Sequence, residues 1–367
     1  MPEANVDLMG LGQSQGQVAN LVANNGRLDI GRMRPYIDPK TGLAYMTVYK
    51  GGDPKQISSY SVTPVTNATL RRDEWKTLDD AIMEVSRQRL GGVDDLISKG
   101  LTYNLVNAMG TTVLEWHDVG EAMEADLTMD GISRGKGDRL IFQHNYLPIP
   151  IIHVDYEINA RVLAASRSLG NPLDTTSAER AARRVIEKVE SMMFTNTSYS
   201  FGEKDTRSNN TIYSLVNHPD RNLVTMGTHW DDLVSTIGAT IVGQVLQMKQ
   251  SAINDYHYGP YMLYIPTNFE TTLDKDYDTV TPGTTIRERI LKIAGITGIK
   301  VIDTLPTDNV LLVQMTSDVV RLVRGMGLQN IQWGEEGNMV TKYKVMTIQV
   351  PQVRSDQNKR SGVIHLA

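Results

Sequence analysis

The chain of 367 residues contains no cysteine, which excludes disulfide bonds, thiolate nucleophiles and cysteine-ligated zinc sites. It contains no run of about 18 apolar residues, so the sequence predicts no membrane span. The N-terminal stretch lacks the basic start and apolar segment of a secretory signal. A formal net charge of −5 provides no overall basic field for binding nucleic acid.

Patterns of catalytic residues are also missing. None of the seven histidines lies at a spacing typical of metal ligands, and no G-x-S-x-G nucleophile elbow occurs. The stretch "RGMGLQN" has two glycines of a dinucleotide-binding loop but lacks the third. We therefore predict that the protein is not an enzyme and has no catalytic residue, cofactor or metal site. An undetected enzyme, with ionisable groups converging in one pocket, is a remaining alternative.

The stretch "DGISRGKGDRL", residues 130–140, superficially resembles a phosphate-binding loop. A Walker loop has four residues between its first glycine and the Gly-Lys pair, followed by Ser or Thr. Here three residues intervene and Gly137 follows Lys136. Alternating apolar and polar residues on both sides instead predict two strands, so the stretch is interpreted as the tip of a β-hairpin.

Residues 1 to about 70 differ from the rest of the chain. They are rich in Asn, Gln, Gly and Pro, with one short predicted strand at "LAYMTVY". Tyrosines in this stretch are large amphipathic surfaces that favour a packing partner. We therefore interpret it as an extended arm that packs on other subunits, with a disordered tail as the alternative. The tyrosines are Tyr36, Tyr45, Tyr49 and Tyr60.

Globular patterning begins near residue 75, and a length of 367 residues favours two or three domains. Leu78, Ala81, Ile82 and Val85 share a helical face, and the following pair of glycines is expected to stop that helix. The clearest helical pattern covers about 175–195, with a predicted capping box from Thr176 to Glu179. Its apolar stripe comprises Ala178, Ala181, Ala182, Val185, Val189 and Met192.

The remainder reads as mixed helix and strand. A helix is predicted over about 233–253, strands at "YMLYIP", "IKVID", "NVLLVQM" and "VTKYKVMTIQV", and a helix at "SDVVRLV". Further helices are expected after Thr267 and Thr285, each with a Glu three residues later. The predicted fold class is α+β.

Residues 147–194 resemble a segment of encapsulins and of related major capsid proteins of tailed phages. The resemblance rests on a Leu-Pro-hydrophobic strand, an Arg-rich turn and a long "spine" helix with a Glu near its end. It extends over most of the chain from Trp75, and the family shares the Hong Kong 97 capsid fold. The matching residues are Leu147, Pro148, Ile149, Arg161, Arg167, Asp174 and Glu190.

The resemblance implies an order of domains along the chain. It gives an N-terminal arm at 1–74, a helix that starts the peripheral domain at 75–120, and an extended β-hairpin loop at 121–145. The peripheral domain with its spine helix would cover 146–230 and the axial domain 231–340, with a return strand to the peripheral domain at 341–367.

The function implied is that of a major capsid protein that self-assembles through hexamers and pentamers into an icosahedral shell around double-stranded DNA. Portal, scaffolding or decoration proteins would be its partners, without sequence-specific DNA binding or a membrane. The expected location is the virion, with assembly in the host cytoplasm. The alternative is an encapsulin-type compartment that holds a cargo enzyme.

Candidate subunit contacts are the four arm tyrosines and the charged hairpin. The hairpin has an acidic face with Glu124 and Asp126, and a basic tip with Arg134, Lys136 and Arg139. Some capsids of this fold crosslink a Lys of this loop to an Asn of a neighbour, promoted by a Glu. Lys136 lies where such a Lys could be, although no motif identifies its Asn or Glu, and the simpler interpretation is a solvated or ion-paired lysine.

Overall fold

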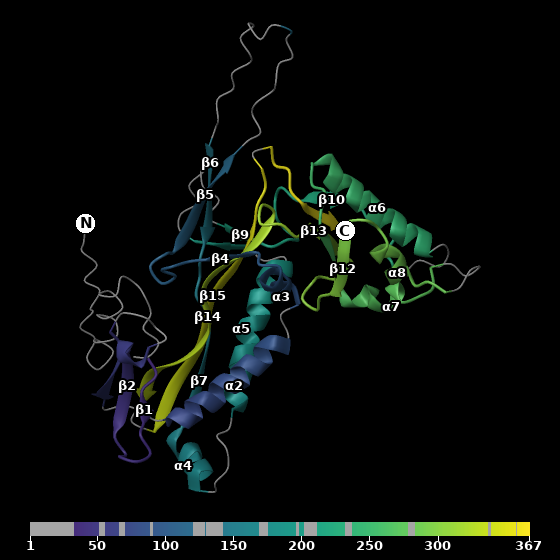
Figure 1. Ribbon diagram of the computed structural model, residues 1–367. Helices are drawn as coiled ribbons and strands as arrows, with labels where there is room; N and C mark the ends of the chain where they lie inside the picture. The colour runs from purple at the N-terminus through teal and green to yellow at the C-terminus, as the bar shows by residue number, and fades with distance from the viewer. Residues whose placement is uncertain are drawn as a thin grey trace.

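The computed structural model places its helices and strands around two larger sheets, with a two-stranded ribbon and a small three-stranded sheet projecting from them (Figure 1). Within the described part of the chain, no helix is long and apolar enough to cross a membrane. The residues described are 33–50, 56–65, 70–88, 91–119, 129, 142–168, 175–195, 198–201, 211–231, 237–277, 283–336, 339–356 and 358–367.

The first large sheet has four strands in the order β4-β14-β15-β7. Its centre is the antiparallel pair β14 and β15, whose register shifts twice between Arg324 and Gln329. Helix α5 covers this sheet, and α2 packs across α5 (Figure 1). The elements of this unit are α2 (Arg72–Gln88), α3 (Gly91–Ser98), β4 (Thr102–Asn104), β7 (Ile152–Asn159), α4 (Ala160–Ser168), α5 (Thr176–Phe194), β14 (Val320–Glu336) and β15 (Val340–Val353).

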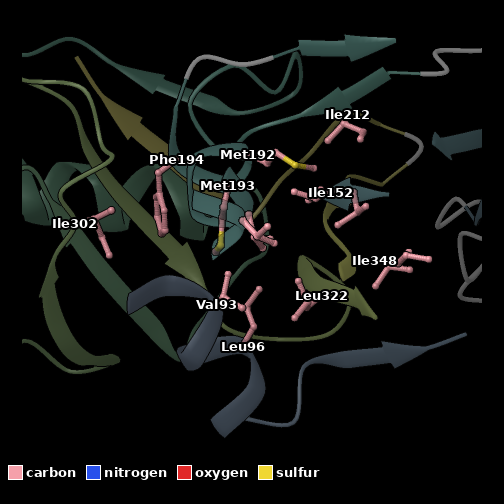
Figure 2. Packing of buried hydrophobic residues seen from close by; sticks show 14 of the residues in the cluster. Val93, Leu96, Ile152, Met192, Met193, Phe194, Ile212, Ile302, Leu322 and Ile348 are labelled. Carbon is pink, nitrogen blue, oxygen red and sulfur yellow. The ribbon is translucent and has the colours of Figure 1, made fainter. Parts of the chain in front are cut away.

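Helix α5 packs on β7 and β15 through an apolar stripe that is rich in alanine. All six residues predicted for the stripe are buried, from Ala178 at its start to Met192 near its end. Small side chains let the helix lie close to the sheet, and larger residues fill the core at its C-terminal end. Figure 2 shows Met192, Met193 and Phe194 directed into this core, which α3 closes with Val93 and Leu96. The predicted spine helix is confirmed.

The second large sheet has five strands in the order β10-β16-β13-β11-β12, with mixed parallel and antiparallel pairing. Its strands β11, β13 and β16 are buried along their whole length, and α6 covers one face together with α8 (Figure 1). The elements are β10 (Asn222–Val224), α6 (Ile237–Asn254), β11 (Tyr261–Ile265), η2 (Thr267–Phe269), α7 (Glu270–Leu273), α8 (Ile286–Leu291), β12 (Ile296–Val301), β13 (Val310–Gln314) and β16 (Val363–Leu366).

Three smaller sets of strands complete the fold. A three-stranded sheet contains β1 (Tyr36–Ile37), β2 (Ala44–Tyr49) and β3 (Tyr60–Val65), and η1 (Ile57–Ser59) precedes its last strand. A ribbon pairs β5 (Val113–Val119) with β6 (Phe142–Pro148), and a short pair joins β8 (Ser198–Ser200) to β9 (Thr211–Tyr213).

Several expectations about local structure are wrong. The stretch "SDVVRLV" contains no helix, because it enters strand β14 at Val320. From Val320 on it pairs with β15, and Leu322 and Val323 pair with β4 as well. Residue 340, at which the axial domain is expected to end, is the first residue of β15 in the four-stranded sheet. The last 27 residues divide between the two large sheets, since β15 belongs to the first and β16 to the second.

The ends of two helices also differ from those expected from the sequence. Gly91 and Gly92 begin α3 instead of merely stopping α2, and a Cβ on Gly92 would lie only 2.2 Å from the ring of Phe194. Glycine is required there because α3 approaches the end of α5 so closely. The N-cap of α5 is Thr175, whose hydroxyl lies 2.5 Å from the Glu179 carboxylate, rather than Thr176. At α8 the predicted cap is confirmed, since Thr285 accepts a hydrogen bond from the N–H of Glu288.

Candidate assembly surfaces

The first described residues are anchored on helix α2 by Arg34. Its guanidinium lies 2.6 Å from both carboxylate oxygens of Asp79 and 4.4 Å from the centroid of the Trp75 ring. The Trp75 indole N–H donates to the carbonyl of Pro35 at 3.0 Å, and this ring is buried. A charge-assisted pair and a cation–π contact thus hold Arg34 on α2.

The arm beyond this anchor is a folded sheet, so the expectation of an extended segment with one strand is wrong for the described residues. Its predicted contact tyrosines pair with each other across strands, with ring centroids 6.5 Å apart for Tyr36 and Tyr45 and 5.4 Å for Tyr49 and Tyr60. Such cross-strand aromatic pairs stabilise a small sheet that has little core of its own. Tyr49 and Tyr60 remain more than a third exposed.

A second ion pair connects α2 with the segment before the spine helix. Arg167 at the end of α4 donates two hydrogen bonds to the Glu74 carboxylate, at 2.8 and 2.6 Å. Burial opposes ionisation of Glu74, but the bonds from Arg167 and from the N–H of Arg71 outweigh it and lower the pKa of this carboxyl. The bidentate geometry is the form in which an Arg–carboxylate pair is strongest.

The junction between the two large sheets contains a buried carboxylate. Glu190, near the end of α5, accepts hydrogen bonds from the N–H groups of Gly92 at 2.8 Å and Val93 at 3.3 Å, at the start of α3. Burial raises the pKa of Glu190 to about 7, and nearby Asp94 and Asp95 act in the same direction, while the two N–H bonds oppose the shift. Glu190 therefore ionises only near neutral pH.

Two residues of the five-stranded sheet meet α3 at the same junction. Lys300 of β12 lies 2.6 Å from Asp95, and the hydroxyl of Tyr264 in β11 donates to that carboxylate at 3.1 Å. The Tyr264 ring also packs against Phe194, the last residue of α5, with centroids 5.0 Å apart. Polar and aromatic contacts thus join the two sheets where the spine helix ends.

The ribbon of β5 and β6 has one face toward the body and one face toward solvent. Trp116 packs against the core, whereas its neighbours Glu115 and His117 are exposed. His144 lies opposite His117 in the strand register, with ring centroids 4.4 Å apart. Nδ1 of His144 is 2.7 Å from the Glu115 carboxylate. The register thus gathers two imidazoles and a carboxylate on one exposed face.

Strand β5 starts at Val113, opposite Pro148 of β6, and the pairing continues to Val119, opposite Phe142. Strand β5 of this ribbon therefore lies before residue 121, where the extended loop is expected to begin. The predicted contact residues Glu124, Asp126, Arg134, Lys136 and Arg139 all lie outside the described residues.

Buried histidines occur in the described part of the chain, but they are held by structural contacts. Burial lowers the pKa of His218 to about 4, and burial together with Arg221 lowers the pKa of His365 to about 4. His365 bonds Asn309 at 2.6 Å and accepts from Arg221 at 3.2 Å. Both imidazoles are therefore neutral at physiological pH, and His365 connects β16 with Asn309 and Arg221.

Solved structures with the same arrangement of elements are subunits of protein shells. A virus-like particle from Pyrococcus furiosus matches with a TM-score of 0.57 at 16% identity, covering 80% of this chain and 99% of that one. The capsid of Myoviridae phage XM1 matches with a TM-score of 0.55 at 10% identity, covering 76% and 92%. The capsid of an empty GTA particle gives 0.51 at 11% identity, covering 83% and 94%.

These likenesses identify the fold as the Hong Kong 97 type, which confirms the predicted fold class. No curated protein matches the sequence. A family model, described as "Family of unknown function (DUF6260)", matches residues 65–366, which is most of the chain and begins at the end of the arm sheet. The chain therefore belongs to this family of unknown function.

Proposed function

We propose that this protein is a major capsid protein, whose copies assemble into an icosahedral shell that encloses a double-stranded DNA genome. The observation that carries the proposal is the likeness along nearly the whole length of shell-forming subunits, up to 99% of the neighbouring chain. At identities of 10–16% this likeness reflects the fold, so the function rests on the fold together with the projecting elements.

The projecting elements support an assembling subunit. A two-stranded ribbon and a three-stranded sheet have too little core to be stable alone, so each gains from a neighbour. In a closed shell, many modest contacts repeated on every subunit add up through avidity. We assign the four-stranded sheet with α5 to the peripheral domain, the five-stranded sheet to the axial domain, and the β5–β6 ribbon to the base of the extended loop.

Further parts of the proposal concern partners and location. Copies of the chain would form hexamers and pentamers, joined by a portal and by scaffolding or decoration proteins. The shell would enclose DNA without sequence-specific contacts, as suits a chain with a net charge of −5. Assembly would take place in the host cytoplasm and the protein would end in the virion.

The test is electron microscopy of the purified, untagged chain, combined with sedimentation and a nucleic-acid assay of any particles. We expect closed shells of uniform size, formed by the chain alone or with a separate scaffolding protein. A chain that stays monomeric in both conditions at high concentration overturns the proposal. Uniform particles that carry a co-purifying enzyme and no nucleic acid would instead identify a cargo compartment.

A further inference from the structure

We propose that Glu115, His117 and His144 form a zinc site that pins the two strands of the β5–β6 ribbon together. One ligand atom from each residue can be chosen so that all three atoms lie within 4.8 Å of one another. Two imidazole nitrogens and one carboxylate oxygen are a donor set that zinc uses in proteins, with a further position open to water. This inference does not depend on the proposed shell function.

Strand geometry explains why the three side chains converge. His117 and His144 are direct partners in the antiparallel register, and Glu115 lies two residues before His117 on the same face. Directly opposed residues have Cβ atoms about 5 Å apart, and residues two apart on one strand share a face. The arrangement therefore follows from the backbone of the ribbon rather than from the side-chain conformations alone.

The distances suit an ion with small adjustments. Tetrahedral zinc with bonds of about 2.0 to 2.1 Å holds its ligand atoms about 3.3 Å apart. His144 and Glu115 now touch at 2.7 Å, so an ion between them needs a slight separation, whereas His117 must approach. The side chains of His144 and Glu115 are 53% and 51% exposed, which leaves them free to rotate into place.

A simple ion pair between His144 and Glu115 is the competing explanation. It accounts for the 2.7 Å contact but does not include His117, whose ring lies edge to face against that of His144 with centroids 4.4 Å apart. If both imidazoles were protonated, their charges would repel each other and only one carboxylate would compensate. A divalent cation uses both neutral rings and the carboxylate together.

The site has a structural use in the ribbon. A two-stranded ribbon is marginally stable by itself, and β5 and β6 form a sheet of their own. The cluster lies near the end of the described ribbon, two residues before Val119 pairs with Phe142. Cross-strand ligation there would hold the register of the strands at the point from which residues 120–141 depart.

The experiment measures zinc binding by the full-length chain without a histidine tag. Isothermal titration with zinc chloride at pH 7.5 should give one ion per chain, and binding should be lost at pH 5 because imidazole ligands must be deprotonated. His117→Ala and His144→Ala should each weaken binding at least about 10-fold, and Glu115→Gln should weaken it by a similar factor. Circular dichroism checks that the exposed substitutions leave the fold intact.

His153→Ala is the matched control. His153 is an exposed histidine on strand β7, 3.6 Å from Asp155, so it has a carboxylate partner but lies outside the cluster. Its replacement should leave zinc affinity unchanged. Zinc should also slow amide hydrogen exchange in 113–119 and 142–148 of the wild type and of His153→Ala, but not of His144→Ala.

Three results with the wild type and the cluster variants would overturn the proposal. They are no zinc binding by the wild type, equal affinity in the wild type and both cluster histidine variants, or zinc binding that leaves exchange in the ribbon unchanged. If His153→Ala weakened binding as much as His144→Ala, the ion would be held non-specifically by surface histidines, which also contradicts the site.

Discussion

Replacing Glu190 by Gln should make the subunit more stable at pH 8, although the carboxylate accepts two hydrogen bonds. The pKa of Glu190 is raised from 4.5 to about 7 in the folded subunit, with burial as the largest cause. Between these values the folded state keeps a proton that the unfolded state has lost. The free energy of unfolding therefore falls as pH rises through this window and is level above it.

The magnitude follows from the size of that shift. A displacement of about 2.5 pH units corresponds to about 3 kcal/mol of lost stability at pH 8, taken as an order of magnitude. Gln is neutral at every pH and keeps an acceptor for the N–H of Gly92. Relative to the wild type, Glu190→Gln should gain up to about 3 kcal/mol at pH 8 and show no difference near pH 4.5.

The assay is urea unfolding of unassembled subunits at several pH values between 4.5 and 8. Glu187→Gln is the control, because Glu187 lies on the same helix, is partly exposed and pairs with Arg184 at 3.1 Å. It should change stability by less than about 1 kcal/mol at every pH. If Glu190→Gln were less stable than the wild type at pH 8, the N–H groups of Gly92 and Val93 would hold the charged form, and burial would not be the dominant effect.

Other predictions address the spine, the arm and the hairpin. Val185→Asp places an unpaired charge in a fully buried position at a cost of several kcal/mol, so the subunit should be insoluble or unfolded, and a soluble folded variant would contradict the packing. Arg34→Ala should weaken the anchor of the arm by about 1–2 kcal/mol, which limited proteolysis would detect as faster cleavage within 36–65 while α2 stays intact. Replacing the three basic residues of the hairpin tip by Ser should leave the subunit folded but make shells dissociate at lower salt, since each exposed ion pair contributes less than about 1 kcal/mol; unchanged shell stability would contradict a role in assembly. Those residues are Arg134, Lys136 and Arg139.

Local periodicity predicted the elements that bury a regular stripe. The spine helix and strands β11, β13 and β15 follow from such patterns, because their burial is set by one face or by a short apolar run. The start of β14 was wrongly predicted as a helix. Around it, Val319, Val320, Leu322 and Val323 are all buried, and their spacing also fits a helix. Only the pairing with β4 and β15 makes this segment a strand, and such pairing depends on residues that are distant in the sequence.

The candidate sites were harder to predict than the fold, because they form from residues that are distant in the sequence. His117 and His144 are 27 positions apart, so a search for short metal-binding spacings missed the pair that the strand register brings together. Glu190 was singled out only through a resemblance, because nothing in its neighbourhood in the sequence indicates that α3 would present its N–H groups to it. The arm sheet was missed for a related reason, since its aromatic pairs form across turns rather than along one strand.

The position of β16 in the five-stranded sheet has a consequence for synthesis on the ribosome. This strand lies between β10 and β13, and β10 is translated about 140 residues before it. At translation rates of about 5–20 residues per second, the partner strand of β10 is synthesised roughly 7–28 s after β10. Until then β10 and β13 each present an unpaired edge that other nascent chains could join. Neighbouring ribosomes on one message would therefore expose aggregation-prone nascent chains close to one another. Chaperone binding during this interval would favour correct pairing of β16 with β10 and β13.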